Sequence, residues 1–394
     1  MKTNWQTKKL GEICAVFADG DWIEKKDQSK QGIRLIQTGN VGNGVFKDRE
    51  EKARYISEKT FKCLRCTEIF PSDCLISRLP DPVGRACIIP KTKSRMITAV
   101  DCTIIRFKKD ILPQWFVNYS LSQNYQNQVN KEVGGSTRQR ISRSNLALIN
   151  IPVPPLLEQK RIVKIMDEAF EKIERAKENA EKNLKNSKEL FESYLQNIFV
   201  NPGKNWKEIT LGEVVKTTQG VQIVKSLQIK NPRIGFKRYL YISDFNHEKN
   251  LKYVEDKYPT KIVTKNDLIV VNTGASAGNI FRGIDGVLSN NLFKVSFDDK
   301  ILDGDFIYYF VTSDIFKKFQ AKIVRGTANP HMGHENFNMT PIFLPSFLEQ
   351  KAIVKKLDAL SEETKKLEGI YKQKLADLEE LKKSVLNKAF NGEL

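Results

Sequence analysis

The triplet Glu-Gln-Lys occurs twice in this chain, at residues 158–160 and 349–351, and its residue types could do chemistry. A carboxylate placed two positions before a lysine is half of a metal-dependent nuclease motif, in which the carboxylate would hold Mg²⁺. Both triplets, however, fall in the first turn of a predicted long helix, where a glutamate favourably faces the positive helix end. No acidic partner lies suitably upstream. We therefore predict that neither triplet is a nuclease site.

Cysteine and histidine offer two further candidate sites. Cys63 and Cys66 have the CxxC spacing of a zinc site, but neither a second CxxC nor a suitably spaced histidine pair completes a set of four ligands. The three histidines, His247, His331 and His334, form no triad with an evident nucleophile. We predict no metal site and no catalytic residue in this chain, and we expect its thiols to be reduced.

Motifs of nucleotide and cofactor chemistry are missing as well. The Asn/Asp/Ser-Pro-Pro-aromatic loop with which amino-methyltransferases grip a flipped base does not occur in the sequence. The glycine-rich stretches at residues 39–44 and 274–278 lack the Gly-Lys-Ser/Thr of a phosphate-binding loop, so we interpret both as turns. The chain is therefore predicted to be a binding protein and not an enzyme.

The charge of the chain indicates what it binds. It has 65 Lys and Arg against 47 Asp and Glu, a formal net charge of +18. Such a surplus favours nucleic acid, an anionic membrane or an acidic protein as the partner. No apolar run approaches the roughly 18 residues that span a bilayer, and residues 1–6 lack the apolar stretch of a signal peptide. We therefore expect a cytoplasmic protein that binds nucleic acid and no membrane.

An internal repeat organises the elements that must position any binding site. A length of 394 residues predicts two or three domains. Trp5 and the Leu-Gly-Glu that follows it return as Trp206 with its own Leu-Gly-Glu, and residues 133–199 align without a gap on residues 324–390. Within each copy, short β-rich runs alternate with Gly, Asn and Pro turns, which is typical of a mixed α/β domain.

Each copy ends in a long charged helix, predicted over about residues 156–199 and 347–390 from proline and capping-box starts and from glycine stops. In the second helix the apolar positions follow a three-four spacing, as in Leu357, Leu360 and Leu367. A stripe this regular would remain exposed on a solitary helix. We therefore predict that the two helices pair with each other as a coiled coil.

Together these motifs resemble the specificity subunits of Type I restriction-modification systems. The resemblance rests on the repeated Leu-Glu-Gln-Lys-x-Ile-Val helix starts, on the loops at residues 134–137 and 325–331 before them, and on the final residues 389–394. It implies an α+β fold: two tandem mixed α/β target-recognition domains joined by two long antiparallel coiled-coil helices with pseudo-two-fold symmetry. The implied boundaries are residues 1–155 and 201–346 for the domains, and residues 156–200 and 347–394 for the helices, which would set the spacer and dock the methyltransferase.

The resemblance also implies a function. The chain would be the non-catalytic subunit that recognises a bipartite, asymmetric site in double-stranded DNA. It would position two methyltransferase subunits together with the restriction/translocase subunits. No cofactor is expected in this chain, because S-adenosylmethionine would be carried by the methyltransferase subunits.

DNA contacts are expected in turns and loops whose side chains suit base edges. Arginine can bridge O6 and N7 of guanine, while asparagine and glutamine can bridge N6 and N7 of adenine. The loops before the two helices differ, with Arg-Gln-Arg at residues 138–140 and Asn-Pro-His at residues 329–331, and non-identical domains imply non-identical half-sites. The predicted DNA-binding residues are Arg78, Arg85, Ser136, Thr137, Arg138, Gln139, Arg140, Asn272, Thr273, Ser276, Asn279, Thr327, Asn329 and His331.

Two other functions fit parts of the sequence. The first alternative is a stand-alone two-domain DNA-binding regulator or architectural protein, which would not copurify with a methyltransferase. The second is a self-sufficient nuclease or methyltransferase, which the missing motifs disfavour.

Overall fold

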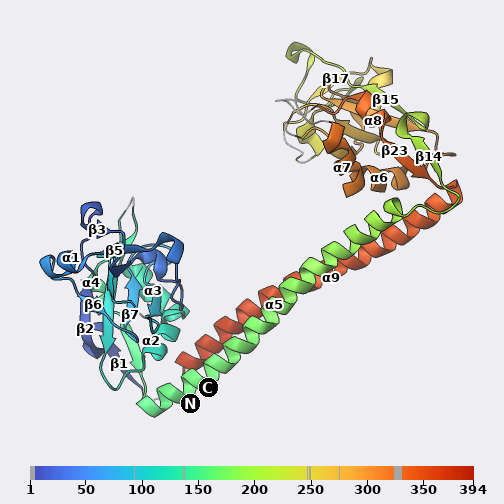
Figure 1. Ribbon diagram of the computed structural model, residues 1–394. Helices are drawn as coiled ribbons and strands as arrows, with labels where there is room; N and C mark the ends of the chain where they lie inside the picture. The colour runs from blue at the N-terminus through green and yellow to red at the C-terminus, as the bar shows by residue number, and fades with distance from the viewer. Residues whose placement is uncertain are drawn as a thin grey trace. The chain divides into compact units, whose positions relative to one another are not determined.

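The computed structural model describes residues 5–92, 94–135, 138–245, 247, 250–274, 276–323 and 331–394. They form two compact units, one of residues 1–181 with residues 373–394 and the other of residues 182–372. Each unit combines one globular domain with a segment of each of two long helices (Figure 1).

The first domain is built from short strands and short helices. The strands are β1 Gln6–Lys9, β2 Cys14–Asp19, β3 Gln28–Ser29, β4 Ile33–Ile36, β5 Arg54–Ile56, β6 Glu68–Ile69, β7 Cys74–Ser77, β8 Ala86–Ile88, β9 Met96–Thr98, β10 Cys102–Phe107, β11 Val133–Gly134, β12 Arg140–Ile141 and β13 Asn150–Val153. The α-helices are α1 Glu58–Cys63, α2 Pro113–Ser120, α3 Gln123–Glu132 and α4 Arg143–Ala147, and 3₁₀ turns lie at Leu10–Ile13, Lys25–Asp27, Thr38–Asn40 and Glu50–Lys52.

The second domain is likewise built from short strands and short helices. Its strands are β14 Lys207–Thr210, β15 Val215–Gln219, β16 Phe236–Leu240, β17 Tyr253–Glu255, β18 Ile262–Val263, β19 Leu268–Val271, β20 Ile280–Arg282, β21 Gly286–Leu288, β22 Leu292–Phe297 and β23 Pro341–Leu344. Its α-helices are α6 Gly304–Thr312, α7 Asp314–Ile323 and α8 His334–Asn338, and 3₁₀ turns lie at Leu211–Glu213, Lys225–Leu227, Ile242–Phe245 and Pro259–Lys261.

The two domains share one topology. A four-stranded sheet has the order β2-β10-β7-β8 in the first domain and β15-β22-β19-β20 in the second. A further sheet in each domain contains a parallel pair, β4 with β9 and β16 with β21, among antiparallel ones. Strand β1 pairs with β13 and β14 pairs with β23, so the first and last strands of each domain lie side by side. Both domains are therefore mixed α/β structures, as the sequence predicts.

The long helices are α5 Leu156–Val200, of 45 residues, and α9 Phe347–Phe390, of 44 residues. Pro154 and Pro155 precede α5, and the pair Ser346 and Glu349 forms the predicted capping box of α9, with the Ser346 main-chain N–H donating to the Glu349 carboxylate over 3.2 Å. After α9, Gly392 has a φ of 72°, which only glycine adopts without strain. Proline, capping and glycine signals thus set the helix ends.

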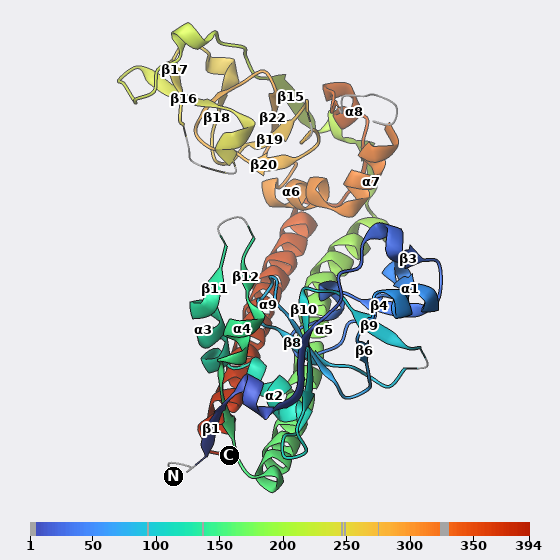
Figure 2. The same ribbon diagram turned by 90° about the vertical axis from the view of Figure 1, so that its left-hand side faces the viewer.

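The helices run antiparallel to each other within the first unit, where the start of α5 lies beside the end of α9 (Figure 2). The Arg161 guanidinium of α5 donates to the carbonyl of Leu394 over 2.6 Å. Farther along the same two segments, Lys177 pairs with Glu379 at 2.7 Å. Partner numbers fall along α9 as they rise along α5, which defines the antiparallel direction. Exposed polar contacts such as these contribute little stability. They show which positions of the two helices face each other, and the burial of apolar side chains stabilises the pairing.

Each domain packs its core against both helices. In the first unit, Trp115 of α2 makes an edge-on ring contact with Phe390 of α9, with centroids 4.8 Å apart, and Ile162 of α5 joins the same core. In the second unit, Phe199 of α5 packs on Phe306 of α6, and Leu357 of α9 joins that core. Removing this much apolar surface from water stabilises helix and domain as one body. The expected class, two tandem mixed α/β domains joined by two long antiparallel helices, is confirmed.

The predicted apolar stripe is buried only in part. Leu357 is fully buried, whereas Leu367 and Leu381 of the same stripe are exposed, as is Leu190 of α5. Ile173 and Ala180 of α5 belong to neither domain core and are nevertheless buried, so buried and exposed positions alternate along the stripe. The three-four spacing therefore predicts the pairing of the helices correctly but overstates how evenly their stripe is covered.

Candidate nucleic-acid interface

Asp101, just before β10, holds two of the predicted DNA-binding arginines. Its Oδ1 lies 3.3 Å from Nη2 of Arg140, and its Oδ2 lies 3.7 Å from Nη2 of Arg138. The two arginine side chains remain 44% and 71% exposed, so both guanidinium groups reach solvent. Gln139 between them is exposed as well. Each arginine keeps several N–H donors free for a nucleic acid.

Asp19, at the end of β2, holds a second pair of arginines. Nη2 of Arg78 lies 3.2 Å from its Oδ1, and Nε of Arg143 lies 3.8 Å from its Oδ2. Arg78 is buried and donates to the carbonyl of Val100, and burial lowers the pKa of its guanidinium. Arg143, the first residue of α4, is half-exposed. The buried Arg78 therefore supports Asp19 from inside the domain, while the half-exposed Arg143 faces solvent.

Main-chain hydrogen bonds join the segments that carry these arginines, and we call this bonded arrangement the frame of the domain. The Arg78 N–H donates to the carbonyl of Asp101 over 2.9 Å, and the Arg78 carbonyl accepts from the N–H of Ile141 over 3.2 Å. Ile141 belongs to β12, which follows directly on Arg138 and Gln139, and it leads into α4. The end of β7, the start of β10, the β12 strand and α4 therefore meet at one place. The predicted residues Ser136 and Thr137 lie outside the described residues.

Arg85 takes no part in this cluster, although the sequence suggests it as a DNA contact. Its guanidinium is buried and donates to the carbonyls of Thr38, Val41, Leu79 and Pro82 over 2.7–3.0 Å. A buried charge that donates four hydrogen bonds to main-chain carbonyls holds its surroundings together. Arg85 fastens the turn before β8 to the loop after β4, and we leave it out of the proposed interface.

The second domain contains the same frame with other side chains. The Asn272 N–H donates to the carbonyl of Asn291 over 3.0 Å, and the Asn272 carbonyl accepts from the N–H of Met332 over 2.7 Å. Thr273 and His331 form an antiparallel bridge beside it. The structure therefore brings Asn272, Thr273 and His331 together. Thr327 and Asn329 lie outside the described residues.

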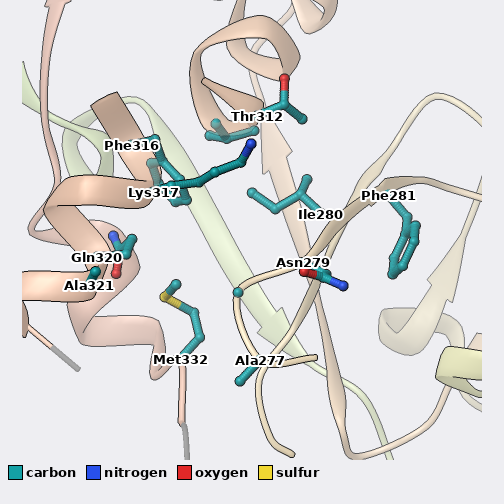
Figure 3. A pocket seen from close by; sticks show the side chains of 12 residues that line it. Ala277, Asn279, Ile280, Phe281, Thr312, Phe316, Lys317, Gln320, Ala321 and Met332 are labelled. Atoms are coloured by element: carbon teal, nitrogen blue, oxygen red, sulfur yellow. The ribbon is translucent and has the colours of Figure 1, made fainter. Parts of the chain in front are cut away.

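Ser276 and Asn279 lie on the turn that joins β19 to β20. The Asn279 N–H donates to the Ser276 carbonyl over 3.0 Å, and the Asn279 side chain is exposed. Beside it opens a cavity of about 490 Å³, walled mainly by apolar side chains of β20, α6 and α7 (Figure 3). In the first domain Tyr125 of α3 is fully buried and donates its hydroxyl to the carbonyl of Gly84 over 2.9 Å. This bond ties the turn between β7 and β8 to α3.

Two residues of these frames were not among those predicted from the sequence. Arg143 and His334 open the short helices α4 and α8, directly after the predicted loops. Nε2 of His334 lies 2.6 Å from Oε1 of Gln219, the last residue of β15. The ungapped alignment of residues 133–199 on residues 324–390 places Arg143 and His334 at the same position, which is the signal that could have found them.

The other candidate chemistries gain nothing from the structure. Within the described residues, no three or more His, Cys, Asp and Glu side chains cluster closely enough to hold a metal ion. Cys63 is exposed and Cys66 buried, and burial raises the pKa of the Cys66 thiol to about 11. As far as the chain is described, none of its helices has the length and apolar character needed to span a membrane.

Comparison with known proteins gives consistent matches. The family described as Type I restriction modification DNA specificity domain matches residues 2–183 and again residues 203–379. The specificity subunit of the Type I restriction enzyme MjaVIII from Methanocaldococcus jannaschii is 25% identical over 316 residues, which cover 73% of this chain and 72% of that protein. Each family match takes in one globular domain and part of one long helix, so it corresponds to one copy of the repeat.

Two solved structures have the same fold. A chain from a study of complex assembly and conformational transition of the type I R-M system has a TM-score of 0.79 at 18% identity, over 99% of this chain and 98% of that one. The HsdS subunit from Thermoanaerobacter tengcongensis has a TM-score of 0.69 at 18% identity, over 100% of this chain and 98% of that one.

Proposed function

The chain belongs to the Type I restriction-modification DNA specificity family, and from this premise we propose that each of its two domains reads one half of an asymmetric DNA site. As a specificity subunit it recognises DNA and is not itself an enzyme. The family membership does not favour the alternative of a stand-alone regulator. The observation that carries the proposal is one main-chain frame, present twice, with arginines on one copy and amide and imidazole side chains on the other.

The frames suit DNA in two ways. Their exposed arginines can pair with phosphates, which gives affinity that depends on salt, and the same donors can reach base edges, which gives specificity. The reading residues that we propose are Arg138, Gln139 and Arg140 in the first domain and Asn272, Thr273, Ser276, Asn279 and His331 in the second. An asymmetric target requires the two domains to contact different bases, and two equal main-chain frames with different side chains meet this requirement.

Replacing Arg138 or Arg140 by alanine is expected to weaken DNA binding. If the lost side chain pairs with guanine, the loss is about 1–3 kcal/mol and is confined to one base pair of the site. Titration of the complex against duplexes that differ by single base pairs measures this. Arg175→Ala, an exposed arginine on α5 paired only with Glu171, is the matched control. Equal weakening on every duplex, with a shallower dependence on salt, would assign the residue to a phosphate instead.

Partner subunits have a candidate docking feature on each copy. Leu157 and Leu348 stand at the second position of α5 and α9, and each is 81% exposed. Leu148 and Met339, at the ends of α4 and α8, form a second repeated pair of exposed apolar side chains. Single exposed apolar residues are ordinary, but the same ones exposed at the same place in both copies indicate two equal contacts. We infer that each copy binds one methyltransferase subunit.

These methyltransferase subunits supply S-adenosylmethionine, because this chain has no motif for it, and the restriction/translocase subunits join the same complex. The proposed location is the cytoplasm, where DNA and the methyl donor are both present. The proposed boundaries are those of the repeat, with domains at residues 1–155 and 201–346 and helices at residues 156–200 and 347–394.

Leu157→Asp is expected to release one methyltransferase subunit, and the double variant Leu157→Asp with Leu348→Asp both of them, because a carboxylate cannot be desolvated in an apolar contact. Native mass spectrometry of the purified complex counts the bound subunits. Ile370→Asp is the control, since Ile370 is 59% exposed on α9 but its equivalent in the repeat is the polar Asn179. Full occupancy in the double variant would show that docking lies elsewhere.

A further inference from the structure

The two frames correspond residue by residue. Gly20 donates its N–H to the carbonyl of Cys102, and Gly220 donates to that of Leu292, in each case over 2.9 Å, which aligns the ends of β2 and β15. The main-chain bonds of Arg78 and Asn272 described above align the remaining segments. The matched positions are Asp19 with Gln219, Arg78 with Asn272, Asp101 with Asn291, Arg140 with His331, and Arg143 with His334.

Every charged position of the first frame has a neutral amide or an imidazole in the second. Asp19, whose carboxylate holds Arg143, is matched by Gln219, whose amide holds His334. The acidic and the basic residue of the first pair are both replaced in the second, by an amide and an imidazole, so the two members of each pair can still interact. The position that opens the short helix is therefore held by the end of the first core strand in both domains. The 2.6 Å contact orients the His334 ring, whereas the 3.8 Å ion pair only draws the half-exposed Arg143 toward Asp19. A side chain that is already oriented loses less freedom on binding DNA, which favours discrimination between bases.

Arg143 can only donate hydrogen bonds. Its Nε faces the Asp19 carboxylate at 3.8 Å, and its side chain is half-exposed. A guanidinium that is oriented in this way presents its remaining N–H groups as a fork. The base edge that such a fork fits best is the O6 and N7 acceptor pair of guanine in the major groove.

His334 offers the opposite chemistry. The Gln219 amide donates from Nε2 to the carbonyl of Asn290, which turns Oε1 toward the imidazole. Because Oε1 can only accept, Nε2 of His334 must carry the proton, and Nδ1 is left as an acceptor. Burial, together with the nearby His331 and Lys261, lowers the pKa of His334, which favours the neutral ring.

A second acceptor lies in the same frame. Oδ1 of Asn272, a buried side chain, has no hydrogen-bond partner among the described residues. A buried polar atom without a partner costs free energy until a donor reaches it. In the major groove the donors are N6 of adenine and N4 of cytosine. Because Oδ1 of Asn272 is buried and the His334 side chain is partly exposed, it is His334 that favours a base with an amino group.

We propose that Arg143 and His334 are paired specificity-determining residues, Arg143 reading a base whose major-groove edge accepts hydrogen bonds through two atoms, as guanine does, and His334 reading a base whose amino group donates one. Asp19 and Gln219 are positioning residues, which act through Arg143 and His334. The proposal rests on the proposed function, in which each domain reads one half-site, and it names the side chains that make the halves differ.

The test uses the complex of this chain with its methyltransferase subunits. The methylated site of the wild-type complex is first mapped by sequencing genomic DNA, and binding to duplexes with every single-base change is then titrated. Arg143→Ala is expected to reduce discrimination about tenfold at one base pair of one half-site, and His334→Ala at one base pair of the other. Ser144→Ala and Glu335→Ala, exposed neighbours on the same short helices, are the controls and should leave both halves unchanged.

The exchange variant, Gln219→Asp with His334→Arg, gives the sharper result. It should change the affected base pair in the second half-site to one with guanine on the contacted strand, while the first half-site persists. Discrimination that is unchanged in Arg143→Ala and His334→Ala, or affinity that falls equally on all duplexes, overturns the proposal. His334→Gln, which retains an acceptor, should keep most of the discrimination, and its loss of discrimination in a folded complex also counts against it. A wild-type complex with no bipartite site would instead refute the proposed function.

Discussion

Exchanging residues 201–346 for the matching segment of a relative is expected to replace one half of the methylated site and leave the other half intact. The segment lies wholly within the second unit. Its first strand β14 pairs with its last strand β23, so both strands of the pair that closes the domain come from the graft. One attachment to α9 uses Gln350, which bonds the N–H of Asp303 and the carbonyls of Ile301 and Pro345. These are main-chain groups, so this attachment does not depend on the sequence of the graft, whereas the bond from the Tyr309 hydroxyl to Asp358 and the packing of Leu357 in the core do.

A genome-wide methylation map of cells carrying the hybrid measures the outcome. The graft should keep aromatic residues at positions 306 and 310, because Phe199 of α5 packs on Phe306 and Phe310 with centroids 5.5 and 5.1 Å away. The reciprocal hybrid, in which residues 1–155 are exchanged, is the control and should alter the other half. A map in which a single exchange changes both halves would contradict the assignment of one half-site to each domain.

Gln159→Leu is expected to lower the free energy of unfolding of the first unit by about 3 kcal/mol. The Gln159 side chain is fully buried. Its Oε1 accepts from the N–H of Leu112, and its Nε2 donates to the carbonyls of Asp110 and Pro154, each over 2.8–2.9 Å. Leucine fills a similar volume but leaves one buried donor and two carbonyls without that partner. Each unsatisfied group costs about 1–3 kcal/mol, partly offset where water reaches it.

Hydrogen exchange at the Leu112 amide reports this bond directly, and thermal unfolding reports the loss of stability. Gln350→Leu should act in the same way on the second unit, with the Asp303 amide as its probe. Lys160→Leu, an exposed neighbour on α5, is the matched control and should leave both readouts close to wild type. A Leu112 amide that stays protected in folded Gln159→Leu would show that Gln159 does not anchor the helix.

The Glu-Gln-Lys triplet shows how far sequence analysis reaches here. Its position, duplicated in the first turn of each long helix, excludes the nuclease interpretation, and the structure assigns glutamate to capping in α9. The role of the glutamine could not be predicted, because its partners lie 47 and 49 residues away along the chain. Capping and helix periodicity depend on residues close together in the sequence, so they can be predicted from it. A buried hydrogen bond between residues far apart in the sequence can be recognised only in the folded structure.

The same limit applies to the candidate interface. Residue type and turn context predict the arginines, but they cannot distinguish Arg85, whose buried guanidinium donates to four carbonyls, from Arg138, which faces solvent. The pair of Asp19 and Arg143 joins residues far apart in the sequence, and neither is unusual on its own. Alignment of the two copies could have identified these residues, because positions that match in the repeat but differ in side-chain chemistry are where the two copies have diverged. Loop residues whose placement lies outside the described part remain predictions.

The unequal charge of the two frames implies a division of labour while the protein searches for its target. In the first frame Asp19 and Asp101 hold four arginines before any DNA is present, so that frame is positive and ordered from the start. In the proposed interface, the exposed arginines of this frame would attract any duplex through counterion release and let the protein slide along it. The second frame, with its amides and imidazoles, would gain less from phosphates and more from contacts to bases. Raising the salt concentration should therefore shorten sliding, through the first domain, while the preference of the second domain for its half-site stays nearly constant.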